Sequence, residues 1–479
     1  MKECSIYIGG EFAESVTRER FESIDPYTRA AWATVPRCNH LDVTRAIESA
    51  RRAFEEWSRF RPSVRGNVLR LIATRLAECV EELALIETLD NGKPIVDTLA
   101  QVGSLPEWFR YYAGLAETMV GHVMPADQGG MFCYTQYEPL GVISAITPWN
   151  SPLMLACWKL APALAAGNTV VLKPSELASA STCEFMRIIR DAGVPPGVVN
   201  LVTGFPTDLG TALVTDPRVA KVTFTGSSAV GRQIGTLAAG EIKPAVLELG
   251  GKSAQIVCED ARLESAVAGV VAGLFRSNGQ SCVAGSRLLV HESVAEKFIG
   301  LLTDAVARLP MGDPRDARTR IGPIANEAQF LKTLGFIEEA KRASATCVLG
   351  GARAVRSGCE GGWFIEPTIF TGVTPDMRIA SEEIFGPVLA VMPFADVDDA
   401  LRVCNDSRYG LAAGVWTQSA ARYYELANRI ECGTVYINTY KNVSVSMPAG
   451  GYKQSGIGRE NGGAGLAEFL QTKSVWVGT

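Results

Sequence analysis

The spacing of apolar residues divides the chain into regions of different predicted structure. The first 40 residues combine short apolar runs with turn residues, which indicates short strands. From Leu41 to about Leu115 the apolar positions recur at helical spacing, and the turn residues at 91–94 predict a helix end. Residues 132–140 alternate between apolar and polar side chains, as an exposed strand does.

From residue 141 onward, apolar runs of strand length alternate with helical stretches. The strands predicted in the first series are 141–147, 169–173, 198–204, 219–225 and 244–251, and the second helix is expected over 176–192. A second series predicts strands at 253–260, 286–293, 345–351, 364–373, 387–395 and 433–440. Such alternation is typical of parallel βαβ units. The sequence therefore predicts an α/β fold, with a Rossmann-like doubly wound sheet followed by a second α/β domain.

Composition and charge narrow the class of protein. The 479 residues include 46 Lys and Arg against 51 Asp and Glu, a formal charge of −5, which offers no basic field for nucleic acid. The start of the chain has no apolar signal core, and Lys159 interrupts the most apolar stretch, 153–167. We therefore expect a cytoplasmic protein without a membrane or nucleic-acid partner.

Cysteine and histidine argue against several chemistries. The twelve cysteines contain no CxxC pair, which is typical of buried free thiols and not of disulfides or zinc ligands. The only histidines are His40, His122 and His291, too scattered for a histidine-based hydrolase. We expect no metal site.

Three residues are candidates for chemistry. Cys282 lies in the polar, Gly-flanked loop SNGQSCVAG, where a thiol is a better nucleophile than in a core. Glu248 ends an apolar strand, where a carboxylate is costly to bury and so is either functional or paired in a salt bridge. Asn150 follows a strand, and its amide can either donate to an oxyanion or cap the helix that begins at 151 or 152.

Two turns after strands are candidates for nucleotide binding. The turn that begins at Gly226-Ser227 and reaches Gly231 precedes a helix, whose amino end attracts phosphate, although a tight structural turn explains it equally well. Lys173-Pro174-Ser175-Glu176 follows the second strand of the series, where dinucleotide folds bind a ribose. Glu176 there favours NAD over NADP, and its alternative role is in the first turn of the next helix.

Together these motifs resemble one family. TPWNSPL, KPSE, FTGS, LELGGKS, GQSC, EEIFGP and GGYKQSGIGRE occur in the order and spacing of the NAD(P)-dependent aldehyde dehydrogenase superfamily. The 34-residue interval from Glu248 to Cys282 is similar to that of its hydrolytic branch. The resemblance implies that Cys282 attacks the aldehyde, that Asn150 and the Cys282 backbone N–H form the oxyanion hole, and that Glu248 activates the water that hydrolyses the thioester.

The resemblance also implies the cofactor site and the domain limits. The implied NAD-binding residues are Ile146, Thr147, Pro148, Trp149, Lys173, Glu176, Gly226, Ser227, Gly231, Leu249, Gly250, Glu383 and Phe385, with NADP as an alternative and a solvated helix face as the other reading of Glu383. The implied domains are a two-part NAD-binding domain (1–123 and 141–249), an oligomerization hairpin (124–140), a catalytic domain (250–435), a substrate-tunnel and return segment (436–465) and an oligomerization strand (466–479). A homodimer or homotetramer is expected.

The substrate segments depart from the common family pattern. Many relatives have PFGG where this chain has Pro448-Ala449-Gly450-Gly451, and an aromatic residue where Val443 stands. Smaller side chains predict a wider tunnel and a bulky apolar or aromatic aldehyde. The predicted pocket residues are Met154, Trp158, Ser281, Val283, Tyr440, Val443 and Ala449. No arginine that could hold a substrate carboxylate is recognised in these segments, which disfavours a semialdehyde without excluding it. Lys441 could serve that purpose, but it is expected to face solvent.

Several alternatives stay open. A semialdehyde dehydrogenase of the same mechanism fits the catalytic motifs equally well, and a catalytically silent structural protein on the same fold is the alternative from another class. A coenzyme A-acylating relative is disfavoured by the presence of Glu248. A relative that recognises a phosphorylated aldehyde is disfavoured because no cluster of Arg and Lys is seen in the sequence near Cys282.

Overall fold

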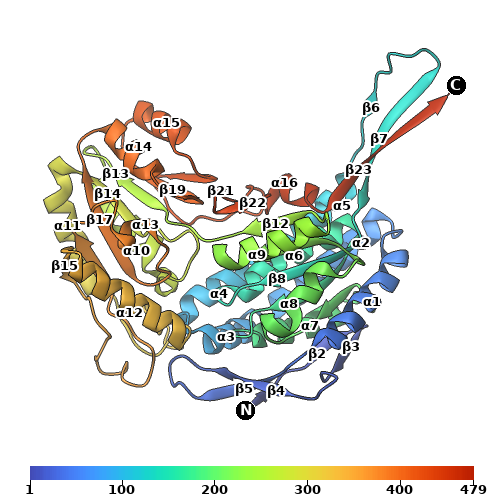
Figure 1. Ribbon diagram of the computed structural model, residues 1–479, viewed down its shortest axis with the longest axis horizontal. Coiled ribbons are helices and arrows are strands. Elements are labelled where there is room, and N and C mark those ends of the chain that lie inside the picture. Colours follow the sequence, from blue (N-terminus) through green and yellow to red (C-terminus); the bar gives the residue numbers. More distant parts are fainter. Residues whose placement is uncertain (479) are drawn as a thin grey trace.

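Two large sheets, each covered by helices, organise residues 1–478, which are the residues that this computed structural model describes (Figure 1). The first sheet has eight strands. In spatial order they are β22 (Gly456–Ile457), β12 (Ala245–Glu248), β11 (Val219–Thr225), β8 (Val142–Thr147), β9 (Thr169–Pro174), β10 (Val199–Leu201), β2 (Ile6–Ile8) and β3 (Glu11–Ala13). The five from β12 to β10 are parallel. Of these five strands, β8 comes first in the chain but lies between β11 and β9 in the sheet. The sheet is therefore doubly wound, as predicted.

Helices cover both faces of this sheet because its strands are apolar on both sides. Val142 packs on one face with α1 (His40–Trp57), α8 (Pro206–Thr215) and α9 (Ser228–Gly240). Ile143, the next residue, packs on the other face. The helices of that other face are α2 (Pro62–Glu78), α3 (Val80–Asn91), α5 (Pro106–Thr118), α6 (Pro152–Ala166) and α7 (Ala180–Asp191). Two cores of alternating strand residues therefore hold the strands in place.

The second sheet forms the other part of the molecule. Its strands in spatial order are β15 (Thr346–Leu349), β16 (Thr368–Thr371), β17 (Val388–Phe394), β14 (Arg287–His291), β13 (Ala254–Val257), β19 (Ala412–Trp416) and β20 (Thr434–Ile437). All are parallel except β15 at one edge. Its main helices are α10 (Leu263–Leu274), α11 (Glu292–Ala307), α12 (Glu327–Arg342), α14 (Val397–Asn405) and α15 (Ala420–Arg429). The second α/β unit is confirmed, with β19 as a strand that the sequence analysis did not name.

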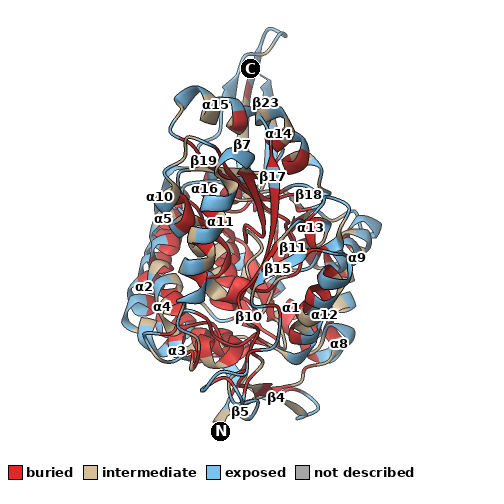
Figure 2. Cartoon of the chain, turned by 90° about the vertical axis from the view of Figure 1, so that its left-hand side faces the viewer, coloured by how far each residue is buried: buried red, intermediate tan, exposed pale blue. Residues whose placement is uncertain are grey.

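A three-stranded arm projects away from the rest of the chain (Figure 1). It consists of β23 (Leu470–Gly478), β7 (Met131–Pro139) and β6 (Val123–Met124), with β23 antiparallel to β7 along its whole length. Figure 2 shows that this arm is largely exposed, whereas the strands of the two large sheets are buried. The predicted terminal strand thus pairs within its own chain; its last residue, Thr479, lies outside the described residues.

The remaining elements are short. The strands are β1 (Lys2–Glu3), β4 (Arg20–Ile24), β5 (Ala31–Pro36), β18 (Tyr409–Gly410) and β21 (Tyr452–Lys453), and the helices are α4 (Ile95–Ser104), α13 (Arg378–Ser381), α16 (Gly462–Ala467) and the 3₁₀ turn η1 (Arg276–Gly279). Within residues 1–478, no helix is both long and apolar enough to span a membrane.

The helix expected over 176–192 begins later, and this prediction was wrong at its amino end. Residues 175–178 form a turn closed by the Ala178 N–H and the Ser175 carbonyl at 3.1 Å. The carboxylate of Asp90, on α3, then accepts the Ala180 N–H at 2.8 Å. A capping group from another helix thus starts α7 at Ala180, and the carboxylate of Glu176 is free of helix capping.

Candidate active site

The carboxyl ends of four parallel strands bring the predicted site residues to one edge of the first sheet. Glu248 is the last residue of β12, Gly226 follows β11, Thr147 ends β8 and Lys173 lies near the end of β9. The sheet reverses its winding direction between β11 and β8 at this edge. In open α/β sheets, ligands bind in the crevice at such a reversal.

The side chain of Asn150 is directed at the loop that carries Cys282. Its Nδ2 donates to the carbonyl of Gln280 at 3.1 Å, and only 8% of the residue is exposed. The alternative role as a helix cap fails, because α6 begins at Pro152 with Ser151 as its N-cap and no side-chain capping bond. The amide of Asn150 therefore lies beside the backbone of the predicted nucleophile.

The loop before Cys282 is held in an uncommon backbone conformation. Ser277, Asn278 and Gly279 all have left-handed φ angles of 56°, 58° and 72°. The Asn278 amide ties the loop to the carbonyls of Gly92 and Pro323 at 3.1 and 2.8 Å. A Cβ on Gly279 would lie 2.3 Å from a backbone oxygen, so only glycine fits there. These bonds fix the approach of the chain to Cys282.

The thiol of Cys282 is protonated at neutral pH in this state of the protein. Burial, together with the carboxylates of Glu383 and Glu248, raises its pKa to about 12, although the Val283 N–H and the charge of Lys441 act in the opposite direction. Desolvation and like charges both disfavour a thiolate. Either a change in these neighbours or an added positive charge is needed to make the sulfur nucleophilic.

Glu248 lies beside a buried ion cluster that the sequence analysis did not identify. Burial raises the pKa of Glu248, the carboxylate of Glu460 raises it further, and Lys159 opposes the rise. Lys159 Nζ donates to Glu460 and, at 2.7 Å, to Thr225 Oγ1. Glu248 Oε1 itself has no hydrogen-bond partner within residues 1–478. Oε1 is thus buried without a hydrogen bond or salt bridge to satisfy it within the protein.

The predicted adenosine and phosphate side of the cofactor site consists of polar groups with few structural bonds. Lys173 Nζ donates to Glu176 Oε2 at 3.3 Å, and burial lowers the pKa of Lys173. Ser227 caps α9 by accepting the Val230 N–H at 3.3 Å, and Gly226 donates its N–H to the Glu248 carbonyl at 3.0 Å. The amino end of a 13-residue helix therefore faces this edge, where it attracts an anion such as a phosphate.

The predicted nicotinamide side is assembled from the two sheets. Glu383 Oε1 accepts the Gly251 N–H at 3.0 Å, and a Cβ on Gly250 would lie 2.3 Å from Glu383 Oε2. Glu383 is thus half-buried beyond the end of α13, which rules out a solvated helix face. The rings of Trp149 and Phe385 meet edge to face, with centroids 5.3 Å apart.

The other predicted cofactor residues lie close to these groups. Ile146 and Thr147 end β8, and Thr147 Oγ1 has no hydrogen-bond partner within residues 1–478. A Cβ on Gly231 would lie 2.3 Å from the side chain of Leu249, so α9 packs directly on the turn after β12. Pro148 connects Thr147 to Trp149 in the turn after β8. The donors, the unpartnered hydroxyl and the helix end fit a dinucleotide.

The predicted substrate-pocket residues separate into two groups. Trp158 stacks on Trp108 with centroids 5.7 Å apart, and Met154 packs half-buried against the same core. Ser281 and Val283 flank Cys282 and are also half-buried. Tyr440, in contrast, belongs to the core of the second α/β unit, where it contacts the backbone positions of Gly414 and Gly273.

Two predicted pocket residues lie near the surface of the final loop. Val443 is 52% exposed. Ala449 exchanges two backbone hydrogen bonds with Glu460, of 2.7 and 2.8 Å. Ala449 therefore adjoins the ion cluster beside Glu248, and Val443 sits at the outer rim.

The comparisons with known proteins agree with this geometry. The model of the aldehyde dehydrogenase family matches residues 12–475. The chain belongs to the aldehyde dehydrogenase family. A Bacillus subtilis (strain 168) protein assigned by name to the aldehyde dehydrogenases, DhaS, is 40% identical over 477 residues, which is 98% of this chain and 95% of the relative.

Solved aldehyde dehydrogenases have the same fold. The betaine aldehyde dehydrogenase of Staphylococcus aureus, in complex with NAD+, superposes with a TM-score of 0.98 at 38% identity. The match covers 99% of this chain and 94% of the S. aureus chain. An aldehyde dehydrogenase of Bacillus cereus, also solved as an NAD+ complex, superposes with a TM-score of 0.97 at 40% identity. The match covers 100% of this chain and 97% of the B. cereus chain. The predicted fold class and family are confirmed.

In this aldehyde dehydrogenase, the structure also reveals charged residues around Lys441 that the sequence analysis missed. Lys441, which was expected to face solvent, is half-buried, and its electrostatic neighbours are Asp97, Arg276, Cys282 and Lys93. Arg276 precedes Cys282 by only six residues, so its position in the chain was the available signal. Asp97 and Lys93 could not have been found from the sequence, since both lie far from the motifs along the chain and are brought close to Lys441 by helix packing.

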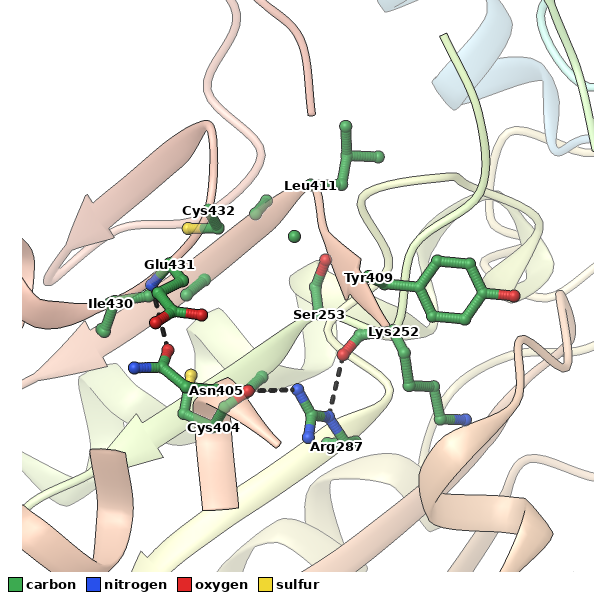
Figure 3. Close-up of a pocket in the computed structure, with 14 residues that line it drawn as sticks. Lys252, Ser253, Arg287, Cys404, Asn405, Tyr409, Leu411, Ile430, Glu431 and Cys432 are labelled. Carbon is green, nitrogen blue, oxygen red and sulfur yellow. Dashed lines mark hydrogen bonds between the residues drawn. The ribbon is translucent and has the colours of Figure 1, made fainter. Parts of the chain in front are cut away.

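A separate hollow lies in the second sheet and contains none of the predicted catalytic residues. It is small and is lined by groups including Arg287, Cys404 and Cys432 (Figure 3). Arg287 donates to the carbonyls of Lys252, Val403 and Cys404 at 2.8–2.9 Å. The guanidinium is therefore structural, and it joins the start of β14 to the end of α14.

The cysteines behave as the composition predicts. All twelve are free thiols, and nine of them are buried. Burial, with a smaller contribution from the Glu87 carboxylate, raises the pKa of Cys157 far above its usual value, which makes that thiol inert. Among residues 1–478, no group of three or more His, Cys, Asp or Glu side chains is arranged to hold a metal ion.

Proposed function

We propose that this aldehyde dehydrogenase oxidises an aldehyde to the carboxylic acid with NAD, using Cys282 as nucleophile, Asn150 as oxyanion donor and Glu248 as general base. The observation that carries the proposal is the meeting of the three at one edge. The Asn150 amide bonds to the loop of Cys282, and Glu248 is an electrostatic neighbour of the same sulfur. The domain limits given above belong to the same proposal.

In the first step, the Cys282 thiol loses its proton to solvent, and the resulting thiolate adds to the aldehyde carbon, so that the carbonyl oxygen becomes an oxyanion. The Asn150 amide and the Cys282 backbone N–H donate hydrogen bonds to that oxygen. Each such donor, when pre-positioned, contributes about 3–4 kcal/mol to lowering a barrier of this kind. Asn150 is held for this role because it is 8% exposed and bonded to Gln280.

NAD, when bound, accepts the hydride that leaves the carbon of the thiohemiacetal. Lys173 and Glu176 are proposed to bind the adenosine ribose, Gly226 and Ser227 to lie next to the pyrophosphate, and Glu383 and Phe385 to hold the nicotinamide end. A carboxylate at Glu176 accepts ribose hydroxyls and repels a 2′-phosphate, which favours NAD over NADP.

Loss of hydride leaves a thioester on Cys282, and water then completes the reaction. Glu248 takes a proton from a water molecule whose oxygen adds to the thioester carbon. The C–S bond breaks, and the acid leaves with the Cys282 sulfur restored. A base works best when its pKa lies near the working pH, and burial raises the pKa of Glu248 from its usual acidic value in that direction.

The substrate we propose is a bulky aldehyde with an apolar or aromatic body. Trp158, stacked on Trp108, and Met154 supply apolar surface, and Ala449 is a small residue where many relatives have phenylalanine. The similar S. aureus protein is a betaine aldehyde dehydrogenase. Betaine aldehyde is a cation, and the positive charge of Lys441 near Cys282 opposes a cation there.

A homo-oligomer formed through the projecting arm is also proposed. Apolar side chains on the arm are exposed: Val123 is 70% exposed and Trp476 64%. An exposed apolar sheet that extends from a protein is typical of a protein interface. Light scattering coupled to size-exclusion chromatography tests it, and a monomer would contradict it. A cytoplasmic location stays a prediction.

The test of the activity is NADH absorbance at 340 nm with purified protein, NAD or NADP, and a panel of aldehydes. We expect NADH formation from a bulky aldehyde with the wild type and none with Cys282→Ala. Activity that persists in Cys282→Ala would overturn the nucleophile. Absence of NADH from every aldehyde, with NAD still bound, would favour the silent structural protein.

A further inference from the structure

Lys441 lies near Cys282, and two other cations, Lys93 and Arg276, are electrostatic neighbours of Lys441; both of these are neutralised by the protein. Lys93 is 3% exposed and donates to Gln101 at 2.6 Å, to Ser151 at 2.9 Å and to Glu87 at 3.5 Å. Arg276 forms a salt bridge of 2.9 Å with Asp97. Each of these cations therefore has a carboxylate of its own.

Lys441 is the third cation, and it has no such partner. Within residues 1–478 its ammonium forms no salt bridge and no hydrogen bond, although the residue is half-buried. The acidic group facing it is Asp97, whose oxygens already accept Arg276 and the Ser277 N–H, the latter at 2.8 Å. An uncompensated ammonium in a half-buried position is energetically costly, so its retention calls for a compensating role.

The backbone of Lys441 indicates that its position is imposed. Its φ angle is 58°, in the left-handed region that a lysine rarely adopts. The preceding residue, Tyr440, is anchored in the core of the second α/β unit, and Asn442 Nδ2 bonds to Thr439 Oγ1 at 2.6 Å. Strained residues of this kind cluster at ligand sites. From this position the charge of Lys441 lies close enough to Cys282 to lower the pKa of its thiol.

We propose that the ammonium of Lys441 binds a carboxylate carried by the aldehyde substrate, so that the substrate of this enzyme is an aldehyde acid. The inference rests on the proposed function, since it assumes that Cys282 attacks an aldehyde. It adds one group to the bulky body proposed above: a negative charge at the end remote from the aldehyde. The semialdehyde alternative is thereby favoured over an uncharged substrate.

The charge balance selects a carboxylate over a phosphate ester. One ammonium is uncompensated, and one carboxylate neutralises it. A phosphate dianion would bring a second negative charge next to the carboxylate of Asp97, whose side chain is only 7% exposed. Like charges at short range in a poorly solvated site repel each other.

The test compares matched aldehydes that differ only in charge. The pairs are 4-carboxybenzaldehyde against 4-methylbenzaldehyde, and succinate semialdehyde against butanal, with NADH formation as the readout. We expect the wild type to have a kcat/KM about 10- to 100-fold higher for the carboxylated member of at least one pair, as a charge-assisted hydrogen bond provides. Lys441→Met should remove this preference, mainly through the KM of the carboxylated member, whereas any loss that comes from a less reactive Cys282 is shared by both members of a pair.

Two further variants keep the test independent of folding. Lys441→Arg retains the charge and should retain the preference for the carboxylated aldehyde. Lys297→Met, on the exposed face of α11, is the matched control and should behave as the wild type. Equal losses for both members of a pair in Lys441→Met would overturn the proposal, since they would indicate a general effect on Cys282.

Other outcomes separate this proposal from the proposed function. Oxidation of neutral and carboxylated aldehydes at equal rates by the wild type would overturn the carboxylate site alone. A preference for glyceraldehyde 3-phosphate over the carboxylated aldehydes would overturn the choice of anion. Absence of NADH from all of these compounds would overturn the aldehyde oxidation itself, and the carboxylate site with it.

Discussion

The two sides of the active site treat a buried lysine in opposite ways. On the Glu248 side, Lys159 is enclosed and bonded to Glu460 and Thr225, so its charge is balanced inside the protein. On the Cys282 side, Lys441 is half-buried and has no partner in the part of the chain that the structure describes. Lys159 therefore acts on the protein's own carboxylates, whereas Lys441 is free to pair with a negatively charged ligand.

The comparison teaches how an internal charge can be assigned a role. Removing one partner of a fully bonded buried ion pair costs much stability, and such a pair mainly changes the pKa values of its neighbours. A cation without a partner lowers the stability of the fold, and such a cost is typical of a binding site. Four predictions test this distinction.

The largest effect is expected from Glu248→Gln. Glutamine keeps the size of the side chain but cannot take a proton from water, so the thioester should accumulate. We expect a rapid burst of NADH close to one equivalent, followed by a steady rate reduced by about 10²–10⁴-fold. Stopped-flow absorbance at 340 nm measures both phases. Steady turnover at the wild-type rate would remove Glu248 as the base.

Lys159→Met is expected to lower stability by about 3–5 kcal/mol, because it leaves the buried carboxylate of Glu460 unpaired. It should also raise the pKa of Glu248 further, since Lys159 opposes that rise. The activity would then recover only at higher pH. Urea unfolding and a pH profile of kcat measure the two effects.

The double variant Lys159→Met/Glu460→Gln is the control for this prediction. It removes both charges of the pair and should regain much of the lost stability. A Lys159→Met protein as stable as the wild type would show that the cluster is not the balanced pair described here.

Lys441→Met is expected to have the opposite effect on stability. Burial lowers the pKa of Lys441 to about 8, below its value in an unfolded chain. Below pH 8 both states hold the proton and the folded state bears the full cost; the cost fades as pH rises and the folded lysine loses its proton. We therefore expect a gain of about 1 kcal/mol at pH 7, after allowing for solvent screening, and a smaller gain near pH 10.

Chemical denaturation at both pH values measures this gain, with Lys297→Met as the control at an exposed position. A loss of stability at pH 7 would mean that Lys441 has a structural partner. The free energy of unfolding is predicted to fall in Lys159→Met and to rise in Lys441→Met, so one series of unfolding curves tests the contrast between the two lysines.

The smallest effect concerns the reactivity of Cys282. The charge of Lys441 lowers the pKa of that thiol, although burial and the nearby carboxylates hold it at about 12. Lys441→Met should therefore slow alkylation of Cys282 by iodoacetamide about two- to five-fold at pH 8, because without that charge the pKa of the thiol rises and less of it is ionised. Mass spectrometry of the Cys282 peptide measures the rate, and Cys282→Ala controls for other thiols. Faster alkylation would contradict the placement of the charge.

Much of the fold could be predicted from local patterns. The alternation of apolar runs and helices identified both α/β units, and the strands at 141–147 and 219–225 match β8 and β11 closely. The start of α7 could not be predicted, because the group that caps it is Asp90 on another helix. Tyr440 was assigned to a substrate wall, whereas it packs in a core that only the assembled second sheet creates.

The sequence by itself determined the family, the doubly wound fold and the candidates Cys282, Glu248 and Asn150, because short motifs and periodicity are local properties of a chain. The tertiary structure alone decided which charges surround them. Lys159 meets Glu460 across 301 residues, and Asp97 meets Arg276 across 179. Whether a lysine such as Lys441 faces solvent or a buried thiol depends on what packs around it, and that packing is set by residues distant in the sequence.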